Sequence, residues 1–191
     1  MCVLCYKPKN IELPPHKVLR ACCLANPDGM GFATSGGEYF RTLDFGEFCR
    51  RLSKIGKSEA VMFHFRLATH GSVRTANCHP FYDESSELFF AHNGVLPHVV
   101  VSNDMTDSET VFRKHFAPVF QQCGNDLTDR YFNYVVKQFL GASRFAFMHG
   151  SDVRLFGEYT LADGVYYSNQ RWCHYLHDSY RYMRLGAETL N

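Results

Sequence analysis

The sequence has no excess of charge of either sign and no long apolar run. Its 20 lysine and arginine residues balance 19 aspartate and glutamate residues, which leaves a net charge of +1. This balance argues against a dedicated nucleic-acid-binding or membrane-surface protein. No apolar stretch approaches the roughly 20 residues that a bilayer-spanning helix needs. The opening MCVLCYKPKN lacks the pattern of a signal peptide, because lysines follow a very short apolar run. We therefore expect a cytoplasmic protein that binds neither nucleic acid nor a membrane.

The sequence also lacks a convincing metal-binding pattern, although it has eight cysteines. Without an export signal, the cysteines are expected as reduced thiols, most of them packed in the core. A zinc site would have to combine Cys2 and Cys5 with the adjacent pair Cys22 and Cys23. Adjacent cysteines are poor ligands for one tetrahedral ion. We therefore expect neither a metal nor a cofactor.

The length and composition predict a single domain over residues 1–191, of which 46% are apolar. Short apolar runs alternate with amphipathic segments, which predicts both strands and helices. Asp44 and Glu47 form a capping box at the start of one helix, and Pro118 is expected to end or kink another. Residues from about 172 to 191 have no clear period and are expected to pack on the domain as a tail. Strands are expected over 2–6, 31–34, 38–43, 60–67, 88–91, 144–148, 153–156 and 165–167, and helices over 16–24, 44–55, 107–116 and 128–140.

Residues 60–67 are the most informative segment, because apolar and polar positions alternate along it. Its odd-numbered positions are apolar, whereas His64 and Arg66 occupy even-numbered positions. Since neighbouring side chains of a strand point to opposite faces, one face packs and the other presents His64 and Arg66 together. A second strand, 88–91, stops abruptly at the turn 92–94. We expect polar side chains to gather where these two strands end.

Cys2 becomes the first residue of the chain if the initiator methionine is removed. Its free α-amine would then lie a few bonds from the thiol and could take the thiol proton directly or through a water. An α-amine titrates near pH ~7.7 and a thiol near ~8.5, so both protons are mobile close to neutral pH. For Cys2 considered alone, the commoner explanation is that one of eight cysteines happens to fall second.

Five short segments follow one another in a defined order. They are Cys2, HFRLATHG at 64–71, NCHPF at 77–81, AHNG at 91–94 and TDSE at 106–109. In this order they resemble the glutamine amidotransferase domain of class II, an N-terminal-nucleophile (Ntn) hydrolase. One such segment would be a weak signal, whereas five in the order of the family are a strong one. The resemblance covers residues 2 to about 111 well and becomes looser afterwards, and Val3 replaces the glycine that usually follows the nucleophile.

The resemblance implies the catalytic residues. Cys2 matches the nucleophile, and Asn93 and Gly94 match the residues that stabilise the oxyanion of the tetrahedral intermediate. The Asn93 side-chain amide and the Gly94 backbone N–H can converge on one point because the strand breaks there. Losing one such donor costs roughly 10²–10³ in rate. Without the other segments, a common Asn-Gly turn would explain these two residues.

The resemblance also implies the residues that bind glutamine. Arg66 matches the arginine that pairs with the α-carboxylate through a planar fork, and Asp107 matches the acid that binds the α-ammonium. Thr69 and His70 match positions that line the glutamine pocket. Considered singly, Arg66 is more often a surface ion pair and Asp107 is more often a helix N-cap. Histidines such as His64 are expected to form structural hydrogen bonds around the site.

The implied reaction is hydrolysis of L-glutamine. Cys2 attacks the side-chain amide, ammonia leaves, and water resolves a γ-glutamyl thioester to glutamate. The implied fold belongs to the α+β class and is a four-layer αββα sandwich, in which two antiparallel sheets lie between helix layers, as the alternating strands allow. Relatives pass ammonia to a synthase or transferase domain on the same chain. No such domain fits in this sequence, so we expect a stand-alone domain whose ammonia goes to a separate acceptor enzyme.

Two other functions are compatible with parts of this pattern. The same machinery could hydrolyse another small amide, although Arg66 and Asp107 suit an amino-acid head group. Alternatively, the fold could be a catalytically silent interaction module in which Cys2 is packed or bound to metal. The joint presence of Cys2, Arg66, Asn93, Gly94 and Asp107 argues against such a module.

Overall fold

The computed structural model describes residues 2–68, 71–97, 99, 105–176 and 187–190. Within these residues the strands form an antiparallel sheet in the order β3-β2-β4-β1-β9-β8-β7-β6-β5, with β10 beside β8. The predicted combination of helices with antiparallel strands is therefore confirmed. The strands are β1 (Val3–Lys7), β2 (Met30–Thr34), β3 (Tyr39–Thr42), β4 (Val61–Phe65), β5 (Phe81–Asp83), β6 (Leu88–Asn93), β7 (Arg144–His149), β8 (Asp152–Ala162), β9 (Val165–Tyr167) and β10 (Ala187–Leu190).

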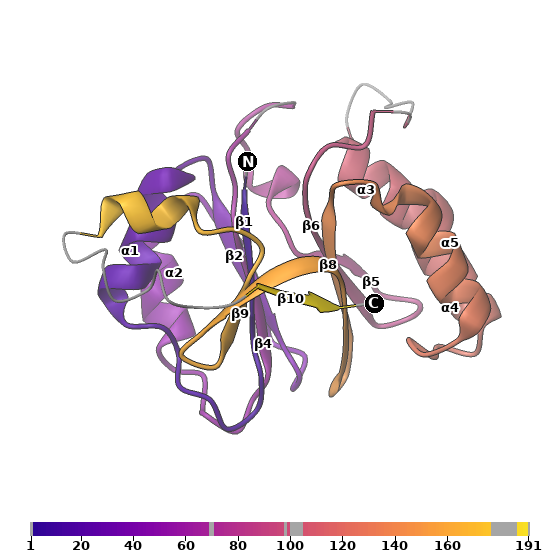
Figure 1. Cartoon of the computed structure of the whole chain (residues 1–191), viewed down its shortest axis with the longest axis horizontal. Helices are drawn as coiled ribbons and strands as arrows, with labels where there is room; N and C mark the ends of the chain where they lie inside the picture. Colours follow the sequence, from indigo (N-terminus) through magenta and orange to yellow (C-terminus); the bar gives the residue numbers. More distant parts are fainter. Residues whose placement is uncertain (1, 69–70, 98, 100–104, 177–186, 191) are drawn as a thin grey trace.

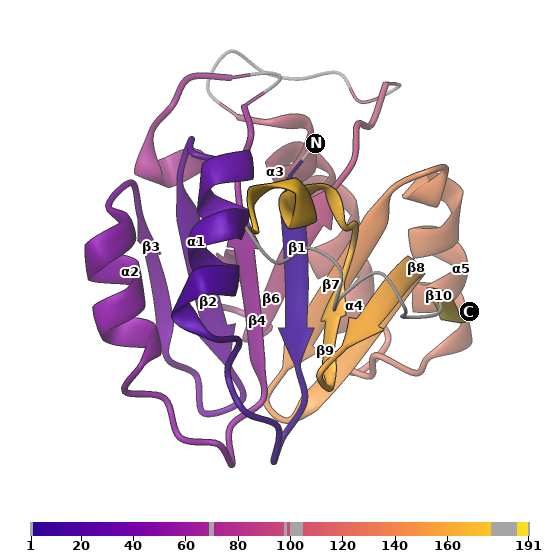
Figure 2. The same cartoon turned by 60° about the vertical axis from the view of Figure 1, so that its left-hand side comes forward.

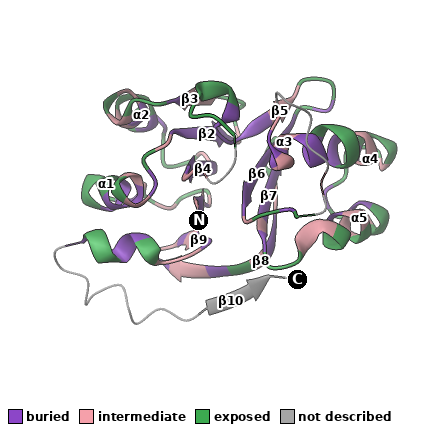
Figure 3. Ribbon diagram, turned by 90° about the horizontal axis from the view of Figure 1, so that it is seen from above, coloured by how far each residue is buried: buried purple, intermediate pink, exposed green. Residues whose placement is uncertain are grey.

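The helices cover the outer faces of this sheet, as Figures 1 and 3 show. Two helices, α1 and α2, lie against the half that contains β1 to β4, and three others, α3 to α5, lie against the half that contains β5 to β7. The helices are α1 (His16–Ala25), α2 (Phe45–Leu52), α3 (Asp107–Val111), α4 (Ala117–Gln122) and α5 (Arg130–Leu140), with shorter or irregular turns η1 (Thr75–Asn77), η2 (Phe112–Phe116) and η3 (Arg171–Tyr175).

Strand β8 makes the sheet curl. Its first residues pair with β7, whereas Thr160 to Ala162 pair with β9, so one strand of 11 residues belongs to both halves. Gly157 lies between these two stretches with φ +92°, and a Cβ there would lie 2.6 Å from the Ser143 carbonyl oxygen. Only glycine tolerates this conformation and this close approach. The sequence predicts a strand over 153–156, whereas β8 is longer. Glycine usually interrupts a strand, but β8 continues through Gly157.

Three apolar clusters fill the spaces between these elements. One lies between the β1–β4 half and the helices α1 and α2, and it contains Phe48 and Phe63. A second lies between the β5–β7 half and the helices α3 to α5, and it contains Phe90 and Phe116. The third, which contains Met62, lies between the two halves of the curled sheet. Alternate residues of β4 therefore enter different cores, as the alternation along 60–67 predicts, but neither face of β4 is exposed.

The helix that begins at Asp107 does not end at Pro118. The segments α3, η2 and α4 follow one another without a gap to Gln122, and Pro118 lies in the first turn of α4. Proline removes a backbone donor and normally interrupts a helix. Here the five residues of η2 form a π-helical turn just before it, so the regular hydrogen-bond pattern already changes at this point. Of the two outcomes predicted for Pro118, an end or a kink of the helix, the end does not occur, and the π-helical turn is an irregularity directly before Pro118.

Other predicted boundaries hold more closely. The Asp44 carboxylate accepts a hydrogen bond from the Glu47 backbone N–H at 2.7 Å, as expected for the start of α2, although α2 ends before residue 55. Gly141 is the C-cap of α5 and has φ +48°, a conformation that glycine adopts readily. Among the described residues, no helix combines the length and apolar character that crossing a bilayer requires.

Candidate active site

Cys2 precedes β1 at the end of the sheet where β4 finishes. Because β1 and β4 are antiparallel and Val3 pairs with Phe65, the register places Cys2 opposite Arg66 and next to Leu67. The Leu67 backbone N–H donates to the Cys2 sulfur at 3.3 Å, and the Leu67 carbonyl oxygen is 3.5 Å from the same sulfur. Burial raises the pKa of the Cys2 thiol, while the Leu67 N–H and the positive charge of Arg66 oppose that rise. The thiol therefore keeps its proton until a base removes it.

The side chain of Val3 lies in the core and not in this site. It is fully buried in the cluster between the β1–β4 half and its helices. Neighbouring residues of a strand point to opposite faces, so the Cys2 side chain points the other way. The extra bulk of valine at position 3 is thus accommodated by the core.

Ser168, after β9, joins the strand of Cys2 to the end of β6. The Ser168 hydroxyl oxygen accepts hydrogen bonds from the Leu4 backbone N–H and from the Asn93 side-chain amide, both at 2.9 Å. The Ser168 backbone N–H donates to the Leu4 carbonyl at 2.9 Å. The next residue, Asn169, donates its side-chain amide to the Cys2 carbonyl at 2.7 Å. The sequence alone gives these two residues no role, because their partners are distant in the chain.

Asn93 and Gly94 lie where β6 ends. Asn93 is buried, and its side-chain oxygen has no hydrogen-bond partner among the described residues. A Cβ on Gly94 would overlap the Ser143 hydroxyl oxygen and lie 2.8 Å from His92 Nε2. Glycine is therefore required at position 94 by close packing and not only by a turn.

Arg66 follows β4 and is only 4% exposed, so it is not a surface ion pair. Its guanidinium donates to the Ser72 carbonyl at 3.1 Å and lies 3.5 Å from the Gly71 carbonyl. A Cβ on Gly71 would lie 3.6 Å from a methyl carbon of Thr106 and 3.7 Å from Arg66 Nη2. The loop after β4 thus brings Arg66 close to the start of α3.

Asp107 is the first residue of α3, and the helix is capped by its neighbour. The Thr106 hydroxyl accepts a hydrogen bond from the Glu109 backbone N–H at 3.1 Å. The Asp107 carboxylate instead accepts from the Leu96 backbone N–H at 3.0 Å and from the Ser108 backbone N–H at 2.8 Å. The alternative that Asp107 serves as the N-cap is therefore wrong.

Three buried histidines lie near the ends of β4 and β6 and the start of α3. The rings of His64 and His79 have centroids 4.4 Å apart, and His64 Nε2 lies 3.1 Å from the His92 carbonyl. His92 Nδ1 lies 2.8 Å from Ser108 Oγ. Burial lowers the pKa of His64 to about 3 and that of His92 to about 4, and it lowers the pKa of His79 strongly. The expected structural hydrogen bonds are present for His64 and His92, whereas both ring nitrogens of His79 lack partners in the described part of the chain.

The turn 26–29 supports the same end of β4. The Ala68 backbone N–H donates to the Asp28 carboxylate at 2.8 Å, and the Arg66 backbone N–H donates to the Gly29 carbonyl at 2.8 Å. A turn that contains glycine therefore lies next to the strand end that contacts Cys2. Thr69 and His70 lie outside the described residues.

Five of the predicted site residues therefore lie at one end of the molecule: Cys2, Arg66, Asn93, Gly94 and Asp107. They belong to the start of β1, the ends of β4 and β6, and the start of α3, which lie at the upper end in Figures 1 and 2. The contacts through Leu67, Ser168 and Gly71 described above link these segments. In the segment from about 172 to 191, Tyr175 is exposed, whereas Tyr180, Tyr182 and Arg184 lie outside the described residues.

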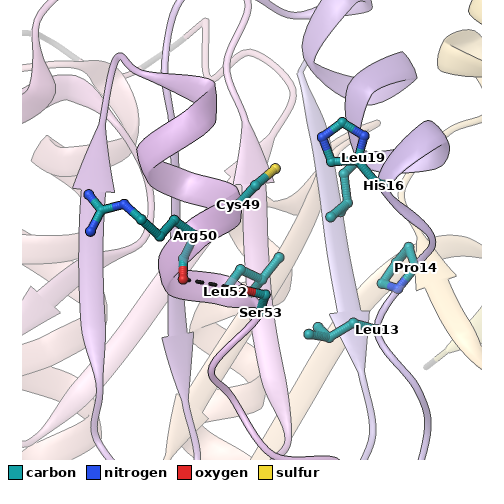
Figure 4. Close-up of a pocket in the computed structure, with 8 residues that line it drawn as sticks. All are labelled: Leu13, Pro14, His16, Leu19, Cys49, Arg50, Leu52 and Ser53. Atoms are coloured by element: carbon teal, nitrogen blue, oxygen red, sulfur yellow. Dashed lines mark hydrogen bonds between the residues drawn. The ribbon is translucent and has the colours of Figure 1, made fainter.

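An apolar pocket of about 340 Å³ lies elsewhere, between α1 and α2 (Figure 4). Burial raises the pKa of its half-buried thiol, Cys49, to about 11, so this cysteine is a poor nucleophile. Among the described residues, no three histidine, cysteine or acidic side chains are arranged to hold a metal ion. The residues that line the pocket are Leu13, Pro14, His16, Leu19, Cys49, Arg50, Leu52 and Ser53.

The fold resembles solved amidotransferase structures. Glutamine phosphoribosylpyrophosphate amidotransferase from B. subtilis, complexed with ADP and GMP, matches 87% of this chain with a TM-score of 0.51 and 19% identity. A structure described as the allosteric regulatory enzyme of purine biosynthesis matches 87% with a TM-score of 0.52 and 18% identity. In each case the match covers 41% of the other chain. These identities show the fold alone, and the fold is that of the Ntn-type amidotransferases.

The sequence comparisons identify the family. The model of the class II glutamine amidotransferases matches residues 44–138, a segment that contains Arg66, Asn93, Gly94 and Asp107 and begins after Cys2. Glutamine–fructose-6-phosphate aminotransferase of Chlamydia trachomatis is 30% identical over 115 residues, which are 54% of this chain and 18% of that protein. A putative enzyme of the same name from Saccharomyces cerevisiae is 50% identical over 40 residues, which are 20% of this chain and 15% of that protein.

The chain belongs to the class II glutamine amidotransferase family. It spans less than a fifth of the length of these two curated relatives.

Proposed function

We propose that this protein hydrolyses the side-chain amide of L-glutamine and releases ammonia for a separate acceptor enzyme. One observation carries the proposal. The start of β1, the ends of β4 and β6, and the start of α3 meet at one end of the sheet, and each brings a residue suited to this reaction. The arrangement also supports the finer fold assignment, a four-layer αββα sandwich in which helices flank the two halves of the sheet.

The nucleophile in this proposal is Cys2 after removal of Met1. The new α-amine removes the thiol proton, directly or through a water, because burial keeps the thiol protonated at rest. The thiolate attacks the amide carbon, the amine returns the proton to the departing ammonia, and a γ-glutamyl thioester remains. Water then attacks the thioester and releases glutamate.

The oxyanion of each tetrahedral intermediate accepts hydrogen bonds from the Asn93 side-chain amide and the Gly94 backbone N–H. One N–H of the Asn93 amide is fixed by Ser168, and an amide nitrogen has a second N–H to offer. Preorganised donors of this kind stabilise developing charge more than water does, because they need no reorganisation during the reaction.

The head group of glutamine is bound by Arg66 and Asp107. The Arg66 guanidinium has five N–H donors, so it can hold loop carbonyls and still pair with a carboxylate. The Asp107 carboxylate has about four lone-pair sites, which leaves room for an ammonium beside its backbone donors. Thr69 and His70 complete the pocket in this proposal.

The test is glutamate release from L-glutamine by the full chain with Cys2 at its N-terminus. Arg66→Lys loses the bidentate fork and is expected to raise KM about tenfold, which corresponds to ~1.4 kcal/mol, with a smaller effect on kcat. Arg50→Lys on the exposed face of α2 is the matched control and should leave both constants unchanged. Failure of the wild-type protein to release glutamate, or hydrolysis of other small amides in preference to glutamine, would contradict the proposal.

A further inference from the structure

We infer that Ser143 is a positioning residue for Gly94, held by a chain of hydrogen bonds that begins at Asp107 and passes through Ser108 and His92. The inference rests on the proposed function, in which Asp107 binds the substrate ammonium and Gly94 stabilises the oxyanion. It joins the two ends of the glutamine site through side chains that do not themselves touch the substrate.

The direction of the hydrogen bonds follows from Asp107. An ionised carboxylate only accepts, so the Ser108 hydroxyl, 3.2 Å away, donates to it. Ser108 Oγ then accepts from His92 Nδ1–H at 2.8 Å. This leaves His92 Nε2 as an acceptor, and the Ser143 hydroxyl donates to it at 3.0 Å. Burial lowers the pKa of His92 to about 4, so the ring remains neutral near pH 7 and can both donate and accept.

The far end of this chain lies directly against Gly94. A Cβ on Gly94 would overlap Ser143 Oγ and approach His92 Nε2 to 2.8 Å, so the Gly94 backbone rests on the bond between these two side chains. The backbone N–H of Gly94 is the proposed oxyanion donor. Its direction is therefore set by the surface on which Gly94 packs.

Ser143 is itself held from two sides. Its backbone N–H donates to the Leu140 carbonyl at the end of α5 at 2.8 Å. On the other side its carbonyl lies close to Gly157 of β8, where a Cβ would come within 2.6 Å of it. Ser143 and Ser108 are both buried. The backbone of Ser143 is thus held in place, so its hydroxyl can hold Gly94 in a defined position.

The first test is kinetic and uses glutamine hydrolysis by the full chain. Ser143→Ala removes the support under Gly94 and is expected to lower kcat about tenfold, part of the loss caused by deleting an oxyanion donor, while KM changes less than about twofold. Ser86→Ala is the matched control, because Ser86 is also a buried serine whose hydroxyl is hydrogen-bonded, in this case to Asp83 at the turn between β5 and β6. Combining Ser143→Ala with Ser108→Ala should lower kcat less than the product of the two single effects. An unchanged kcat in folded Ser143→Ala, or a change confined to KM, would overturn the inference.

The second test does not depend on glutamine turnover. NMR of protein labelled with ¹⁵N-histidine and ¹⁵N-glycine should show His92 as the Nδ1–H tautomer, and Ser143→Ala should shift the Gly94 amide resonance whereas Ser86→Ala should not. An Nε2–H tautomer, a doubly protonated ring, or an unmoved Gly94 amide would contradict the hydrogen-bonded chain. If the wild-type protein releases no glutamate, the proposed function fails, and this spectroscopic result still decides whether the chain exists.

Discussion

At the scale of single residues, Ser168 connects two distant segments of the proposed site through one hydroxyl group. Its hydroxyl oxygen accepts from Leu4, two residues after the proposed nucleophile, and from Asn93, a proposed oxyanion donor. Removing it leaves the buried Leu4 N–H without that partner and frees the Asn93 amide to rotate. A buried donor that loses its acceptor costs about 1–3 kcal/mol.

We therefore predict that Ser168→Ala lowers the free energy of unfolding by roughly 1–3 kcal/mol and also lowers kcat for glutamine, with little change in KM. Denaturant unfolding and steady-state kinetics measure the two effects. Ser53→Ala is the control, because Ser53 is exposed at the end of α2. A variant that loses stability but keeps its full kcat would show that Ser168 does not orient Asn93.

Whether a residue of the site can be predicted from the sequence depends on how far along the chain its partners lie. Cys2, Arg66 and Asp107 could be proposed from the sequence because each lies in a short segment whose order is informative. Ser168 could not, because the partners of its hydroxyl are 164 and 75 residues away. Ser143 was likewise missed, since its contact with His92 spans 51 residues.

At the scale of elements, β8 determines how the two halves of the sheet face each other. The strand changes partners from β7 to β9 around Gly157, where the backbone has φ +92° and passes close to the Ser143 carbonyl. A period-two pattern predicts a strand, but it does not reveal that one strand serves both halves. The π-helical turn before Pro118 is also not predictable, because no local sequence pattern indicates it.

We predict that Gly157→Ala destabilises the protein by roughly 1–3 kcal/mol, the usual range for one strained backbone position. The added methyl group would also displace the Ser143 carbonyl, so kcat should fall with stability. Gly56→Ala is the control, since a Cβ at position 56 would make only an ordinary contact with Ser58 at 3.6 Å. Equal unfolding midpoints for the two variants would show that the bend does not require glycine.

At the scale of the whole molecule, three neutral histidines are buried close to one another, in β4, before β5 and in β6. Burial lowers the pKa of His64 to about 3 and that of His92 to about 4, and it lowers the pKa of His79 as well. An unfolded chain would protonate these rings near pH ~6.5. Below that pH the unfolded state binds more protons than the folded state, so acid favours unfolding.

We predict that the contribution of these histidines to stability is constant above pH ~6.5 and is lost as the pH is lowered towards about 4. At pH 5 the loss should be about 2 kcal/mol for each histidine that stays neutral, before most carboxylates titrate. Chemical denaturation at a series of pH values measures this slope. His79→Leu should reduce the slope, and His174→Gln should not, because His174 is exposed. A stability that does not change between pH 6.5 and 5 would contradict the burial of neutral rings.

The central claim is that Cys2 is an amino-terminal nucleophile for glutamine. Its most direct test is the intact mass of the protein before and after incubation with 6-diazo-5-oxo-norleucine, an electrophile that mimics glutamine. We predict loss of the initiator methionine and a single adduct, which is slowed by excess L-glutamine and absent in Cys2→Ala. Retention of methionine, or no adduct on correctly processed wild-type protein, would contradict the account.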